Sequence, residues 1–215
     1  MELTWLGHSC FRLRGKDATL ITDPPSPTTG YSLGRISADI VTISHDHIGH
    51  NYVKGIGGDP RIVSGPGEYE ISQILITGVQ TYHDDERGRR LGRNTAYLIT
   101  MDEIQICHLG DLGTILDDNA QEALAGADVV LVPVGGGNSL SAGQAAEVIA
   151  QIEPRIVVPM HYATPNYHPG AAELDPLDKF CHEMGVEVTE PLPKAVITKA
   201  NLPAETQILL LGYRG

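Results

Sequence analysis

Short apolar segments fill the first half of the chain, and several of them end directly at a histidine or an aspartate. The residues at these segment ends are Asp23, His45, His83, Asp111 and His161. Because ligands of α/β proteins gather at the loops that leave the strand ends, these side chains are expected to converge. A lone histidine would more often be a hydrogen-bonded core residue. Five segments that each end at a histidine or an aspartate instead favour a common site.

The expected helices and strands define an α/β fold class. Apolar runs between turn residues predict strands at 2–6, 10–14, 18–22, 39–44, 61–64, 71–82, 94–100, 104–109, 128–134, 155–159, 186–189, 195–199 and 207–211. Helices are expected at 119–125, 141–152 and 175–185, with Ser141 as the N-cap of the second. The first strands should be antiparallel, and the second helix should lie within a β-α-β unit. We expect sheets layered with helices in a single domain over residues 1–215.

Charge and cysteine content limit the expected partners and location. Asp and Glu number 27 against 15 Lys and Arg, a net charge of −12, which disfavours binding to nucleic-acid phosphates. Cys10, Cys107 and Cys181 are too widely spaced for a disulfide framework, so reduced thiols and a cytoplasmic location are expected. The chain has neither a membrane-length apolar run nor an export-type N-terminal segment, so no membrane partner is expected. A small-molecule substrate is the expected partner, and the sequence is compatible with a homo-oligomer.

Three of the nine histidines, His45, His47 and His50, lie within six residues, directly after a strand of buried type. Such crowding has no packing purpose. Neutral imidazole is a common ligand of Zn²⁺ and similar metals, and a catalytic site needs about three protein ligands with one position open for water. The cluster therefore predicts a metal site, with a solvated histidine-rich turn as the alternative.

The order of motifs along nearly the whole chain resembles that of the metallo-β-lactamase superfamily. Its signature loop reads His-x-His-x-Asp-His after a strand and is followed downstream by a His, an Asp and a final His. The stretches 4–11, 94–99, 108–113 and 159–162 resemble those of a small bacterial metal-dependent hydrolase branch. That branch is similar to ascorbate-6-phosphate lactonase and, more distantly, to N-acyl-phosphatidylethanolamine phospholipase D. The resemblance implies a four-layer αββα sandwich.

The resemblance also implies a role for each matched residue. The implied metal ligands are His45, His47, His50, His83, Asp111 and His161. His45, His47 and His83 would hold the first metal, and His50 and His161 the second. Asp111 would bridge the two and is the catalytic candidate. Asp23 would orient the signature loop, and His8 and His108 are expected to support the ligands or to contact substrate. The cofactor would be one or two divalent transition metal ions, with zinc expected and manganese or iron as alternatives.

One position departs from the family pattern. Gly49 stands where the signature loop has the aspartate that binds the second metal. Its absence removes one negative charge beside two dications, so weaker or partial occupancy of the second site is expected. Asp46 lies between His45 and His47, and we expect it to point away from the metals and to make structural hydrogen bonds.

Hydrolysis is the natural chemistry of such a site, because a metal with an open position makes hydroxide available at neutral pH. The sequence has no Gly-x-Ser-x-Gly elbow, Walker loop or Rossmann fingerprint. We predict a hydrolase that acts on a small anionic ester, lactone or phosphodiester. The main alternative is a degenerate metal-binding member with a regulatory or scaffolding role. A nuclease is a third option, which the acidic charge disfavours.

Four arginines lie within the seven residues 87–93, shortly after His83. Arginine binds carboxylate or phosphate through two parallel hydrogen bonds, so this loop would be able to clamp an anionic substrate. The favoured interpretation is nevertheless a solvated hairpin whose charge is balanced by the acidic residues 84–86.

Overall fold

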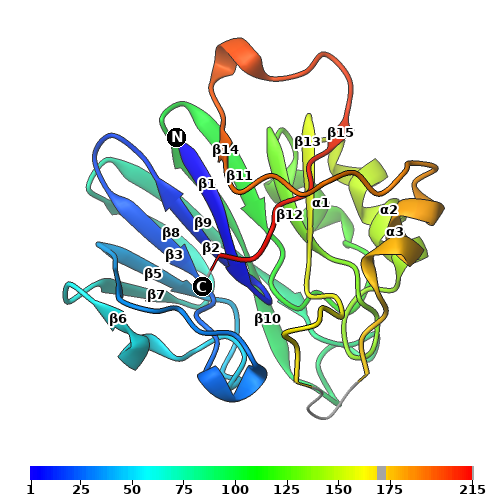
Figure 1. Cartoon of the computed structure of the whole chain (residues 1–215), viewed down its shortest axis with the longest axis horizontal. Coiled ribbons are helices and arrows are strands. Elements are labelled where there is room, and N and C mark those ends of the chain that lie inside the picture. The colour runs from blue at the N-terminus through cyan, green and yellow to red at the C-terminus, as the bar shows by residue number, and fades with distance from the viewer. Residues whose placement is uncertain (169–172, 215) are drawn as a thin grey trace.

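Two large β-sheets form the body of the computed structural model, which describes residues 1–168 and 173–214. The six-stranded sheet has the order β14 (Ala195–Val196), β1 (Glu2–Gly7), β2 (Cys10–Arg14), β3 (Thr19–Thr22), β5 (Ile40–Ile43) and β7 (Arg61–Ser64). The seven-stranded sheet has the order β15 (Gln207–Ile208), β13 (Ile156–Met160), β12 (Val129–Pro133), β11 (Ile104–His108), β10 (Arg93–Met101), β9 (Ile74–Tyr82) and β8 (Gly67–Ile71). The two sheets overlap in the view of Figure 1, where β8 and β9 of one sheet are seen with β2 and β3 of the other.

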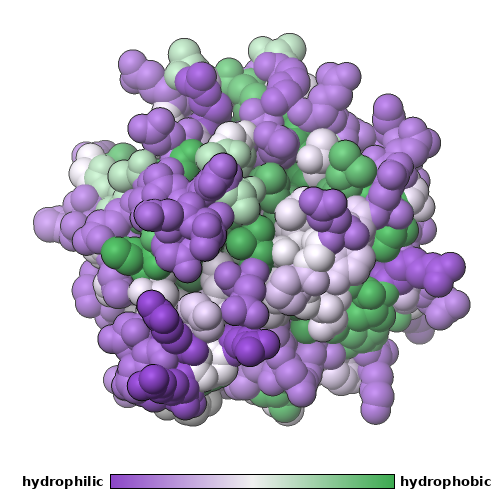
Figure 2. Space-filling model, turned by 180° about the vertical axis from the view of Figure 1, so that it is seen from behind, coloured by the Kyte–Doolittle hydropathy of each residue, from purple (hydrophilic) through white to green (hydrophobic). Residues whose placement is uncertain are grey.

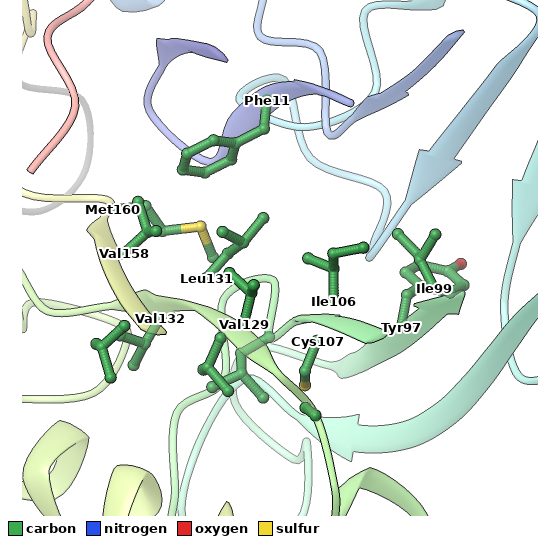
Figure 3. Close-up of a cluster of buried hydrophobic side chains, with 14 of the residues drawn as sticks. Phe11, Tyr97, Ile99, Ile106, Cys107, Val129, Leu131, Val132, Val158 and Met160 are labelled. Atoms are coloured by element: carbon green, nitrogen blue, oxygen red, sulfur yellow. The ribbon is translucent and has the colours of Figure 1, made fainter. Parts of the chain in front are cut away.

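The main core lies between the sheets. Phe11 on β2 is fully buried and points toward Leu131 and Met160 of the seven-stranded sheet (Figure 3). Side chains alternate between the two faces of a strand, so Val132 and Cys107 point to the opposite face, where the helices lie (Figure 3). Burial on both faces explains why these central strands read as continuous apolar runs.

On the outer face of the seven-stranded sheet, the described residues form three α-helices. Helices α1 (Asp118–Leu124) and α2 (Ala142–Ile152) contact the sheet, and α3 (Leu177–Glu183) packs against α2 (Figure 1). The expected N-cap of α2 is confirmed, because the Ser141 side chain and the Gln144 side chain form a reciprocal capping box. Helix α2 connects the parallel strands β12 and β13, which confirms the expected β-α-β unit.

The outer face of the six-stranded sheet has a different cover. Leu6, Ile21 and Val41 from that sheet pack with Ala38 and Ile56, which lie in or beside the small sheet of β4 (Ile36–Ser37) and β6 (Ile56–Gly57). Short 3-10 helices, η1 (Pro27–Thr29) and η2 (Val53–Gly55), flank this sheet, whereas η3 (Lys199–Asn201) lies near the C-terminus. Within residues 1–168 and 173–214, the outer layer on this side therefore contains the small sheet and no α-helix, in place of the second helical layer that the expected αββα order implies.

Strand direction explains how residues far apart in the sequence meet. β1, β3 and β5 run in one direction, since β1 and β3 are each antiparallel to β2 and β5 is parallel to β3. β9, β11 and β13 likewise share one direction in the other sheet. In each sheet, the C-terminal ends of these three strands therefore lie on the same side of the molecule, where the strands of that sheet end.

Two expectations about the strands differ from the structure. The segment 71–82 contains the turn of a hairpin between β8 and β9, at Ser72 and Gln73, which both have positive φ angles. A two-residue turn of this conformation usually contains Asn or Gly, so its sequence signal was absent. The strand expected at 186–189 is wrong, because Val186 and Val188 lie exposed in irregular chain.

The surface gives little indication of a large apolar contact. Figure 2 shows one face on which hydrophilic side chains dominate and hydrophobic ones are scattered, as is normal for a protein surface. In the part of the chain that the structure describes, no helix is long and apolar enough to cross a bilayer. The three cysteines are free and buried.

Candidate metal centre

The strand ends of the two sheets meet at a buried cluster of histidines and aspartates. The six-stranded sheet supplies His8 after β1, Asp23 after β3, and His45 with His47 and His50 after β5. The seven-stranded sheet supplies His83 after β9, His108 and Asp111 at the end of β11, and His161 after β13. The structure thus brings together all the residues that the sequence singled out for the site.

Asp111 lies at the centre of this cluster and is almost completely buried. Its Oδ2 lies 3.0 Å from His50 Nε2, 3.5 Å from His83 Nε2 and 3.8 Å from His45 Nε2. Its Oδ1 faces the other way, 3.2 Å from His161 Nε2. One carboxylate therefore contacts ring nitrogens from both sheets, which is the position that a bridging ligand needs.

Hydrogen bonds behind the cluster orient the imidazole rings. His50 Nδ1 lies 2.8 Å from the buried carboxylate of Asp23, which also accepts a hydrogen bond from the Ser44 backbone N–H at 2.7 Å. His45 Nδ1 lies 2.9 Å from the Ser44 hydroxyl. Both rings are thereby held with Nε2 toward Asp111, as a ligand histidine requires.

Burial and neighbouring charges set the protonation of the cluster. Burial, assisted by repulsion from His50, lowers the pKa of His45 to about 3. His50 behaves in the opposite way: burial alone would lower its pKa, but Asp111 and Asp23 together raise it to about 10. For Asp111, burial alone would raise the pKa, but His161 and His50 outweigh it and hold the pKa well below its usual range. A neutral His45 therefore lies beside an ionised Asp111, and a positive charge is favoured on His50, between Asp23 and Asp111.

His108 occupies a supporting position. Its Nε2 lies 2.8 Å from the Ser9 carbonyl oxygen, and the Ser9 hydroxyl lies 3.5 Å from Asp111 Oδ1. The Asn94 side chain also supports Asp111, since its Oδ1 accepts the Asp111 backbone N–H at 3.0 Å. Asn94 and Ser9 lie within the sequence motifs, but only the fold shows which atoms they hold.

A cavity of about 420 Å³ opens over the cluster. The site residues that line it are His8, His45, His47, His83, Asp111 and His161. The walls include Ile48, Leu91, Asn138, Tyr167 and Leu174. This volume lies within the range of small-molecule sites, whose walls are mostly apolar with a few polar groups.

The arginine-rich loop folds around Asp84 and does not point its charges into the cavity. The Asp84 carboxylate accepts four backbone N–H groups, those of Glu86, Gly88, Arg90 and Leu91, at 2.7–3.0 Å. Although burial opposes the change, these bonds lower the pKa of Asp84 to about 2. All four arginines are exposed, and Leu91 is the residue of this loop that lines the cavity. The arrangement favours the solvated loop over the arginine clamp.

The donor atoms of the cluster fit a divalent metal ion. Three groups offer ligand atoms that all lie within 4.8 Å of one another: His45 with His47 and His50, His45 with His83 and Asp111, and His8 with His50 and His161. Among the described residues, His45 Nε2 and His8 Nδ1 are buried nitrogens without a hydrogen-bond partner. Buried polar atoms normally have a partner, so these nitrogens suit coordination better than packing.

Two sequence expectations can be compared with this geometry. Asp46 does not join any ligand group, and its carboxylate accepts a hydrogen bond from the Asn51 side chain. This agrees with the expected structural role. His8 joins a ligand group directly, although the sequence indicated only support or substrate contact. The signal was present, since His8 immediately follows the first strand, as the other site residues follow theirs.

Comparison with known proteins assigns the chain to a family. Residues 2–161 match the model of the beta-lactamase superfamily domain. A UPF0173 metal-dependent hydrolase of Methanoculleus marisnigri is 30% identical, over 76% of this chain and 82% of that protein. Another, from Methanopyrus kandleri, is 25% identical over 87% of this chain and 94% of that protein.

The solved structures include a similar protein from Thermotoga maritima, assigned as a Zn-dependent hydrolase of the metallo-beta-lactamase superfamily. It is 31% identical to this chain, with a TM-score of 0.81 over 99% of both chains. This likeness confirms the predicted α/β metallo-β-lactamase fold, while the resemblance to ascorbate-6-phosphate lactonase stays a prediction. The match to the domain model spans well over half of this chain, and the chain therefore belongs to the beta-lactamase superfamily.

Proposed function

We propose that the protein is a metal-dependent hydrolase that acts on a small anionic ester, lactone or phosphodiester in the cytoplasm. The observation that carries the proposal is the convergence of four histidine Nε2 atoms within 3.8 Å of the Asp111 carboxylate, beneath an open cavity. The relatives that are named metal-dependent hydrolases support the reaction class. The three buried free cysteines are compatible with a reducing compartment.

The proposed metal ligands are His45, His47, His50, His83, Asp111 and His161. A divalent metal held there supplies hydroxide at neutral pH and polarises the scissile bond. Asp111 keeps a negative charge between the two groups of histidines, because its pKa lies well below the usual range. Asp23 keeps a hydrogen bond on His50 Nδ1, so Nε2 of the same ring stays directed toward Asp111.

The cavity indicates how substrate would be held. Ile48, Leu91 and Leu174 form apolar walls, whereas the described cavity-lining residues include no lysine or arginine. An anionic group of the substrate would therefore meet the metal centre, and its apolar part would contact the walls. This favours a compact substrate whose charged or polarised oxygen lies close to the scissile bond.

The test is hydrolysis by protein purified with zinc, measured with bis-p-nitrophenyl phosphate and with simple lactones. We expect turnover that His47→Ala lowers about 100-fold or more, since loss of a ligand removes several kcal/mol of transition-state stabilisation. His182→Ala is the control, because His182 is an exposed residue of α3, outside the cavity. Bound zinc without turnover of either substrate class would favour the regulatory or scaffolding alternative, and absence of bound metal would contradict the proposal.

A further inference from the structure

The space beside Gly49 is occupied by the ring of His8. A Cβ atom built on Gly49 would lie 2.8 Å from His8 Nε2 and 3.1 Å from His8 Cδ2, closer than side chains normally approach. Gly49 does not have a positive φ angle, so its backbone would accept an aspartate. His8 is therefore the obstacle, and its imidazole occupies the place where a carboxylate at position 49 would begin.

The backbone holds His8 firmly in this place. His8 has a left-handed conformation, with φ of 53°, which is uncommon for a residue other than glycine. Its carbonyl oxygen accepts hydrogen bonds from Trp5 Nε1 at 2.9 Å and from the His161 backbone N–H at 3.2 Å. The turn that carries His8 is thus fastened to the strand end that carries His161. Strained conformations of this kind persist where the surrounding structure fixes them, and they cluster at functional sites.

The His8 ring completes a group of three imidazoles. Its centroid lies 4.2 Å from that of His161 and 5.0 Å from that of His50, and the three residues are buried. One nitrogen from each ring can be chosen so that the three lie within 4.8 Å of one another. Asp111 adds its two oxygens, at 3.0 Å from His50 Nε2 and 3.2 Å from His161 Nε2. Three imidazoles and the Asp111 carboxylate therefore surround one position that could hold a second metal ion.

A packing role alone explains His8 less well. The ring does contact aromatic neighbours, with centroids 5.9 Å from Tyr167 and 6.2 Å from Tyr31. A tyrosine or phenylalanine would make such contacts without placing polar atoms in the interior. His8 instead buries Nδ1, for which the described residues offer no hydrogen-bond partner, at the cost of its desolvation.

We propose that His8 is a ligand of the second metal and replaces the aspartate that Gly49 lacks. The inference rests on the proposed function, because it assumes that metal binds on both sides of Asp111. The second site would then consist of His8, His50, His161 and Asp111. Exchanging a carboxylate for an imidazole keeps the number of ligands but removes a negative charge, so this site should favour Zn²⁺ over the harder Mn²⁺.

The experiment compares wild type, His8→Gly, Gly49→Asp and the double variant His8→Gly/Gly49→Asp. Glycine at position 8 accepts the positive φ and removes the ring, which makes room for the aspartate side chain. Each protein is stripped of metal, loaded with zinc and measured for metal content per chain. The affinity for the second equivalent is measured by competition with a chelator. Cobalt absorption spectra report the ligand geometry, and none of these readouts depends on turnover.

We expect two zinc ions per chain in wild type and one tightly held ion in His8→Gly, with the second bound about 10–100-fold more weakly. The double variant should regain the second ion and should bind manganese better than wild type does. His182→Ala should leave both equivalents unchanged. Recovery in the double variant would also show that His8→Gly is folded well enough to be compared, and thermal melting of each metal-free protein checks this directly.

Unchanged affinity for both zinc ions in a folded His8→Gly variant would overturn the inference while leaving the hydrolase proposal intact. A wild type that holds only one zinc ion at saturation would also overturn it. Failure of the hydrolase proposal has a different signature, in which two zinc ions bind as expected but no substrate is turned over.

Discussion

The two sides of Asp111 differ in burial and in the way their histidines are held. On one side, which we call the open side, His47 is exposed, and His45 and His83 line the cavity. On the other side, His8 and His161 also line the cavity, but His50 between them does not: it is fully buried, hydrogen-bonded to Asp23 and packed against both rings. The open side is suited to exchange and to contact with substrate. The side of His50, which we call the closed side, is suited to hold a metal ion firmly. It is also the side on which the chain departs from the family pattern, at Gly49.

The largest effect is expected from Asp111→Asn, because this residue serves both sides. The variant keeps the shape of the side chain but loses the charge that faces four histidines. We expect turnover to fall about 1000-fold or more and both metal equivalents to weaken, which kinetics and metal analysis would measure. A variant that lost only one of the two equivalents would show that Asp111 is not shared between the sides.

A smaller effect, confined to the closed side, is expected from Asp23→Asn. Asparagine keeps the size but weakens the bond that orients His50, so affinity for the second ion should fall about 10–100-fold. The first ion, near His45 and His83, should bind as in wild type. Titration with a chromogenic chelator resolves the two equivalents, and equal weakening of both would contradict the division into two sides.

The metal-free protein should lose stability in mild acid because the pKa of His45 is lowered, whereas the raised pKa of His50 acts only at higher pH. A free histidine has a pKa near 6.5. His45, with a pKa lowered to about 3, stays neutral when folded, so its unfolded form takes up a proton below about pH 6.5 and stability falls. His50, with a pKa raised to about 10, stabilises fully below about pH 6.5, and this contribution is lost as the pH rises through 10.

Thermal melting of chelator-treated protein between pH 5 and 8 checks this balance. We expect the melting temperature to fall between pH 6.5 and pH 5, and His45→Gln to reduce that fall. A melting temperature that did not change over this interval would contradict the assigned protonation of the cluster.

The smallest effect is expected from Arg90→Ala, outside both sides of the centre. Arg90 is exposed and its nearest ion pair, to Asp85, spans 3.9 Å, so the pair contributes little. We expect kcat/KM to change less than about 2-fold for neutral and anionic substrates alike, since a surface pair is worth about 0–1 kcal/mol. A tenfold rise in KM for anionic substrates alone would contradict this expectation and support the arginine clamp.

The sequence predicted the parts of this molecule that depend on local pattern. The β-α-β unit, the Ser141 cap and the strand ends at His45, Asp111 and His161 all follow from apolar runs that stop at a polar residue. The turn at Ser72 and Gln73 was missed because its positive φ angles come from pairing of the flanking strands, not from residues that prefer them.

The position of His8 relative to Gly49 could not be predicted in the same way. The two residues are 41 positions apart, and their contact depends on how the turn after β1 packs beside the loop after β5. The missing aspartate is visible in the sequence, but the imidazole that fills its place is visible only in the fold.

The most direct test of the metal centre is a crystal structure of the zinc-loaded protein with anomalous scattering measured at the zinc edge. The account predicts two peaks, one on each side of the Asp111 carboxylate, with ligand nitrogens about 2.0–2.1 Å away. The first should lie among His45, His47 and His83, and the second among His8, His50 and His161. Crystals soaked at saturating zinc that showed no peak beside Asp111 would contradict it.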